Sequence, residues 1–138
     1  MTQQERDLKL HELNLEYMRL SREINRKKDI DICDKKREID KAHRLYLDAK
    51  RETLDVINTI QYEKCKLPDG EEKELKEAHI RRLEQQLGMM KEEYLLEVEH
   101  IRAKHDETRR QLDEEARALS EWHKEEKFKI IKEACNED

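Results

Sequence analysis

The only proline of this chain lies near its middle, in the segment Leu67-Pro68-Asp69-Gly70, with 66 residues before the segment and 68 after it. Proline presets one backbone angle and glycine accepts angles closed to other residues, so Pro-Asp-Gly is a strong turn signal. The only other glycine is Gly88. The pattern therefore predicts two long helical arms, at about residues 3–66 and 71–135, joined by a tight turn at residues 67–70.

The composition favours long helices over a sheet. Ala, Glu, Lys, Leu and Arg supply 77 of the 138 residues, whereas aromatic residues make up only 4%. Such a composition is typical of coiled coils and long helices, and sheet-rich folds need more turn, β-branched and aromatic residues. We therefore expect an all-α protein, a coiled-coil-like antiparallel hairpin, in which residues 1–138 form a single helical domain.

Helix-end signals lie at the chain start and beside the turn. Asp69 can cap the second arm, with Glu72 three residues later as a capping-box partner. Thr2 and Glu5 repeat this pattern before the first arm. Lys64 lies where the C-terminus of a helix favours a cation. These signals predict the same arm boundaries as the turn does.

Each arm carries an apolar stripe. In the second arm its mean period is close to 3.6 residues, which predicts a nearly straight helix. The stripe of the second arm comprises Ile80, Leu83, Leu87, Met90, Tyr94, Val98, Ile101, His105, Thr108, Leu112, Ala116, Leu119, His123 and Ile130. The stripe of the first arm comprises Leu10, Leu13, Tyr17, Leu20, Ile24, Ile39, Ala42, Tyr46, Ala49, Thr53, Ile57 and Ile60. Between its two halves, over residues 25–38, this stripe thins to Ile32.

Folding at the turn brings together residues whose numbers sum to about 137. The polar stretch at residues 25–38 then faces residues 99–112, where His105 lies in the stripe of the second arm. Gly88 falls opposite Ala49, as a close approach of the two backbones would require. If His105 is buried in the seam, leucine in its place should raise the melting temperature.

The polar stretch leaves a second architecture open. Asp31 and Asp34 could cap a new helix if the first arm broke near residues 25–34. The chain would then form a more compact three-helix bundle with a thicker core.

Five leucines lie beside the main stripes: Leu8, Leu15, Leu47, Leu54 and Leu96. They could widen the core face of a helix, or they could contact another helix. Because a two-helix protein buries little area per residue, pairing of two hairpins into a four-helix dimer would cover them. We therefore expect them to form an interaction surface for a protein partner, foremost a second copy of the chain.

Glu97 and His100 have the spacing with which helical bundles hold pairs of metal ions. Asp40 and His43 share that spacing, and Asp40 lies opposite Glu97 in the hairpin register. With 35 acidic residues and six histidines, such pairs also arise by chance on a solvated face. We therefore assign no metal ion and no cofactor, and keep a di-metal bundle only as a remote alternative.

Other activities lack the residues that they need. No nucleophile-base pairing, glycine-rich phosphate loop or other catalytic motif occurs, so we expect no enzyme. The net charge of −5 disfavours nucleic-acid binding, which needs a basic surface. No apolar run approaches the roughly 20 residues of a membrane span, and the first residues do not resemble a signal peptide. Three distant cysteines without a CxxC pair predict free thiols in the cytoplasm.

These observations predict a non-enzymatic coiled-coil scaffold, adaptor or stalk protein that acts through helix-helix contacts. The alternative is a small helical regulator or inhibitor that docks on an enzyme complex. If the protein is a scaffold, we expect symmetric self-assembly. If it is a regulator, we expect a monomer that forms a complex with another protein.

Overall fold

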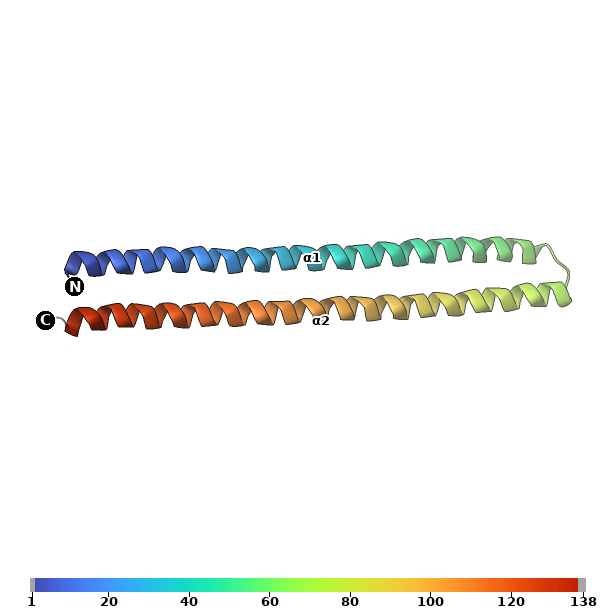
Figure 1. The fold of residues 1–138 in the computed structure, drawn as a ribbon. Helices are drawn as coiled ribbons and strands as arrows, with labels where there is room; N and C mark the ends of the chain where they lie inside the picture. Colours follow the sequence, from blue (N-terminus) through green and yellow to red (C-terminus); the bar gives the residue numbers. More distant parts are fainter. Residues whose placement is uncertain (1, 137–138) are drawn as a thin grey trace. The chain divides into compact units, whose positions relative to one another are not determined.

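The protein is an all-α helical hairpin, described for residues 2–136 by a computed structural model. Helix α1 spans Gln3–Cys65 and helix α2 spans Glu71–Asn136, and no strand occurs within residues 2–136. Figure 1 shows both helices as continuous ribbons joined by one turn. The predicted hairpin and its turn at residues 67–70 are therefore confirmed.

The three-helix alternative is wrong, because α1 continues without interruption through residues 25–34. The polar stretch remains helical since its charged side chains find partners on α2. Asp31 binds His105 instead of capping a new helix, and Lys28 pairs with Asp113.

The contacts between the two helices fall into two compact units. We call residues 35–103, which include the turn, the turn unit. In the described part of the chain, the terminal unit comprises residues 2–34 and 104–136. Within the terminal unit the start of α1 lies beside the end of α2 (Figure 1).

Local hydrogen bonds define both ends of α1. The Glu5 backbone N–H donates to Thr2 Oγ1 at 3.2 Å, and the Thr2 backbone nitrogen donates to Glu5 Oε2 at 3.3 Å. This reciprocal pair is the predicted capping box. At the other end, the Lys66 N–H donates to the Glu63 carbonyl at 3.2 Å. Such i to i−3 bonds tighten the last turn of a helix.

Helix α2 begins at Glu71, as predicted, but its N-cap lies one residue later than the sequence indicated. The Gly70 carbonyl accepts the first helical hydrogen bond, from the Glu74 N–H at 3.1 Å, so Gly70 holds the N-cap position. Asp69 Oδ1 accepts a hydrogen bond from Lys73 Nζ at 3.0 Å. The prediction that Asp69 caps α2 is therefore wrong, because glycine is itself a favourable N-cap and the aspartate pairs with a lysine side chain.

The two predicted stripes form the seam between the helices, because every stripe residue is buried or half-buried. In the turn unit, Ile57, Ile60 and Ile80 form an apolar cluster, against which Leu83 and Leu87 pack. Ile57 is only 4% exposed. The constant period of both stripes keeps these side chains on one face of each helix.

Two details of the predicted seam are wrong. Ile32 is 54% exposed, since the helical period that runs through Ile24 and Lys28 reaches the seam at Asp31 and not at Ile32. Gly88 does not mark a close approach of the backbones, because a Cβ atom built at this position would meet nothing within 4 Å.

Candidate interaction surfaces

A polar layer, in which His105 is buried and Asp113 is exposed, joins the two helices of the terminal unit. His105 Nδ1 lies 2.5 Å from Asp31 Oδ1, and His105 is only 5% exposed. One helical turn before Asp31 on α1, Lys28 Nζ lies 2.8 Å from Asp113 Oδ1. The hydrogen bond and the charge of Lys28 hold the pKa of Asp113 below its ordinary value. These pairs confirm that the polar stretch of α1 faces the polar part of the α2 stripe.

The bond to Asp31 changes what a leucine at position 105 should do. His105 is the buried seam residue that the stripe predicted. Leucine would remove the partner of a half-buried carboxylate, and an unsatisfied polar group costs about 1–3 kcal/mol. We therefore expect His105→Leu alone to lower the melting temperature, opposite to the expectation from the sequence.

A second polar contact lies nearer the chain ends. His123 Nε2 lies 2.8 Å from Asn14 Oδ1, so the ring N–H donates to the amide oxygen. The same ring stacks on Tyr17, with 4.3 Å between ring centroids. The numbers of Asn14 and His123 sum to 137, which agrees with the register that the sequence predicts.

The candidate metal ligands of the turn unit do not form a metal centre. His43 Nδ1 lies 3.0 Å from Tyr94 Oη, and Tyr94 in turn stacks on Tyr46. Asp40, His43, Glu97 and His100 are all exposed. Within residues 2–136, no group of three or more His, Cys, Asp or Glu side chains is arranged to hold a metal ion.

Two ion pairs cross between the helices next to the turn. Lys76 Nζ lies 2.9 Å from Glu63 Oε2, and Lys64 Nζ lies 3.4 Å from Glu77 Oε1. The hydrogen bond and the charge of Lys76 hold the pKa of Glu63 below its ordinary value. Because their carboxylates are exposed to solvent, we expect these pairs to align the helices more than to stabilise them.

The five predicted interaction residues are exposed. Leu47 and Leu54 are each 38% exposed at the edge of the seam, and more than half of the surface of the other three is exposed. These five leucines are Leu8, Leu15, Leu47, Leu54 and Leu96. None of them belongs to the buried core of the described residues.

A shallow groove beside Leu15 was not predicted from the sequence. We call it the α1 groove; its volume is about 320 Å³, and it is lined by Leu15, Met18, Arg19, Arg22, Glu23 and Arg26. The positions that follow a stripe residue by two point away from the seam, because two residues turn a helix by about 200°. Reading those positions along α1 would have indicated this apolar and basic face.

Neither α1 nor α2 has a segment that is apolar enough to cross a membrane. Comparison with protein family models, with curated protein sequences and with solved structures finds no match to this chain. A fold alone does not define a function, so the exposed surfaces carry the functional interpretation.

Proposed function

We propose that this protein is a non-enzymatic coiled-coil scaffold, adaptor or stalk that acts through helix-helix contacts. The observation that supports this proposal is the excess of exposed over buried apolar side chains. Among the residues whose side chains the structure describes, sixteen large apolar residues are at least 38% exposed, whereas eight apolar residues are buried. Where exposed apolar side chains lie next to one another, they mark a surface that binds other proteins.

A second copy of the chain is the first partner that we propose. Each copy buries only a narrow seam, and a four-helix arrangement of two hairpins would cover leucines that one hairpin leaves exposed. We place the protein in the cytoplasm, where a reducing environment keeps thiols unpaired. The free, exposed state of Cys33, Cys65 and Cys135 supports that compartment.

Leucine-to-glutamate pairs in the two units test the proposal. Leu8→Glu with Leu15→Glu changes the terminal unit, and Leu47→Glu with Leu54→Glu changes the turn unit. Because these side chains are exposed, the hairpin should keep its helix content by circular dichroism. At least one pair should lower the molar mass measured by light scattering.

The matched control is Asn58→Glu with Gln61→Glu, which adds the same charge at exposed polar positions. Its mass should equal that of the unmodified protein. If the unmodified chain is a monomer that binds an enzyme complex instead, the alternative regulator function replaces the scaffold.

A further inference from the structure

The α1 groove lies on the side of the terminal unit that points away from α2. Arg22 and Arg26 each follow a seam residue, Leu20 and Ile24, by two positions. That offset corresponds to about 200° of rotation around the helix. Both arginines are exposed, so the groove combines guanidinium groups with the accessible apolar surface of Leu15.

Part of the basic charge of the groove has no partner within the chain. Arg19 Nη1 lies 3.5 Å from Glu23 Oε1 on the same helix. Arg22 and Arg26, in contrast, make no ion pair with any residue between 2 and 136. The groove is therefore prepared for a ligand that supplies carboxylates.

Helix α2 presents a surface of the opposite charge in the same unit. Glu114, Glu121 and Glu125 each follow a seam residue by two positions and are exposed. Phe128, which is 65% exposed, lies three residues further along the same side. An apolar ring next to three carboxylates complements an apolar side chain next to arginines. We call this surface the acidic α2 face.

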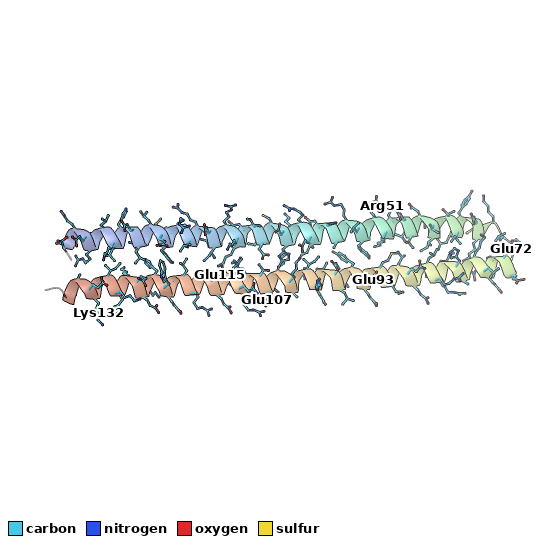
Figure 2. All side chains as sticks on the ribbon, in the orientation of Figure 1. Arg51, Glu72, Glu93, Glu107, Glu115 and Lys132 are labelled. Carbon is cyan, nitrogen blue, oxygen red and sulfur yellow. The ribbon has the colours of Figure 1, made fainter. Side chains whose placement is uncertain are left out.

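The neighbouring charges agree with this complementarity. Glu107 lies on the side of α2 that points away from α1 (Figure 2), and Arg110 Nη1 neutralises it at 2.8 Å from Glu107 Oε2. Nearer the chain ends, Glu12 lies at the level of Glu125 in the hairpin register, so the opposite charges are those of the arginines of the groove and of Glu114 and Glu121.

The positions of these groups along the helices also match. If a second copy lies alongside the first with no shift along the helix axis, its α2 runs antiparallel to α1 of the first copy. The two helices then face each other in the same register as the two helices of one hairpin. The contact between Asn14 and His123 sets those levels. Phe128 of the second copy then lies between the levels of Leu8 and Leu15.

In the same alignment, the arginines of the α1 groove lie close to the levels of the glutamates of the acidic α2 face. The same register places Arg26 at the level of residue 111, within one helical turn of Glu114. Arg22 then lies between the levels of Glu114 and Glu121. Each unpartnered arginine of the groove therefore has a carboxylate of the acidic α2 face within about one helical turn.

We propose that the α1 groove binds the acidic α2 face of a second copy of this chain, an inference that rests on the proposed scaffold function. Two grooves repel each other through their arginines, and two acidic faces repel each other through their glutamates. The contact is therefore heterologous: each bound copy keeps one groove or one acidic face free, and assembly can continue beyond a dimer. The aromatic and leucine side chains supply apolar burial, and the charges supply specificity.

Charge reversal on one face at a time tests this contact. Arg22→Glu with Arg26→Glu removes the groove, and Glu114→Arg with Glu121→Arg removes the acidic face. Light scattering of the full chain at about 50 mM salt, where charges are weakly screened, should show assembly of the unmodified protein that grows with concentration. Each double variant alone should associate at least about tenfold more weakly.

An equal mixture of the two double variants provides the decisive result. The groove of one variant and the acidic face of the other are both intact, and the two reversed faces are again opposite in charge, so the mixture should recover assembly that grows with concentration. The matched control, Lys27→Glu with Lys36→Glu, makes the same change in charge at exposed lysines outside both faces. It should assemble like the unmodified protein, and circular dichroism should show the same helix content for all variants.

Three results would overturn the inference. If both double variants assemble as the unmodified chain does, the groove is not the contact; loss of assembly in the Leu47→Glu, Leu54→Glu variant would then leave the scaffold function standing on another surface. If the mixed variants remain apart, the two faces do not bind each other. A chain that is monomeric at every concentration would contradict both this contact and self-assembly as a scaffold.

Discussion

The two units of the hairpin use different chemistry at the same seam. In the turn unit, Ile57, Ile60 and Ile80 form a continuous apolar cluster. In the terminal unit, the seam is interrupted by His105, which is buried against Asp31. An apolar side chain stabilises the fold against any apolar surface that covers it. A buried polar group stabilises the fold only where it meets its hydrogen-bond partner. We therefore expect the turn unit to supply most of the stability and the terminal unit to specify the register.

The largest effect should come from opening the apolar cluster. Ile57→Ala should lower the free energy of unfolding by about 3 kcal/mol, because it removes buried methyl groups and leaves a cavity. Chemical denaturation followed by circular dichroism measures this change. The neighbouring Val56→Ala is the control, since Val56 is 46% exposed and should change the value by less than about 0.5 kcal/mol. Equal effects at both positions would mean that this cluster is not the stabilising core.

Breaking the polar layer should have the next largest effect. His105→Leu should lower the free energy of unfolding by about 2 kcal/mol, because the Asp31 carboxylate loses its partner. Asp31→Leu combined with His105→Leu should recover that loss, since an apolar pair often replaces a buried polar pair without cost. Thermal denaturation of both variants measures the comparison. A single variant that is more stable than the unmodified protein would contradict the proposed role of this bond.

Replacing the glycine within α2 should stabilise the turn unit by a smaller amount. Gly88→Ala should raise the free energy of unfolding by about 1 kcal/mol, because alanine favours the helix and a Cβ atom at this position meets no other group within 4 Å. Urea denaturation measures the increase. A decrease would indicate a close contact that the structure does not contain.

The smallest effect concerns pH and an ion pair of the terminal unit. Because Lys28 holds the pKa of Asp113 below its ordinary value, the folded state binds this proton less readily than the unfolded state. The pair therefore stabilises the fold above about pH 4 and loses its contribution as the pH falls further. In Lys28→Met the melting temperature should fall slightly less between pH 5 and pH 2 than in the unmodified protein. The exposed Lys27→Met is the control, and a steeper fall in Lys28→Met would contradict the assignment.

Much of the hairpin follows from the sequence because its signals are periodic. A stripe with a 3.6-residue period requires a partner, and one central turn leaves only one register in which both polar stretches meet. That register is confirmed by Asn14 with His123. Single positions could not be resolved by the same reasoning. Asp31, and not Ile32, occupies the seam, because an average period leaves the position at any one level uncertain by a residue.

The candidate surfaces were only partly predictable. The exposure of Leu8 and Leu96 follows from their distance to the stripe. The α1 groove combines Leu15 with arginines, and charged residues on an outer face usually indicate only solvation. A binding role for the arginines of the α1 groove is indicated only when they are compared with the acidic α2 face of the same unit. The identity of a partner is not encoded in either pattern alone.

Sedimentation equilibrium of the unmodified full chain tests the central claim most directly. The experiment covers concentrations from about 1 μM to about 1 mM, the range over which modest protein affinities appear. We predict a molar mass that rises with concentration to at least twice that of one chain, and that falls again in about 0.5 M salt as the charges are screened. A molar mass equal to one chain at every concentration would contradict the account.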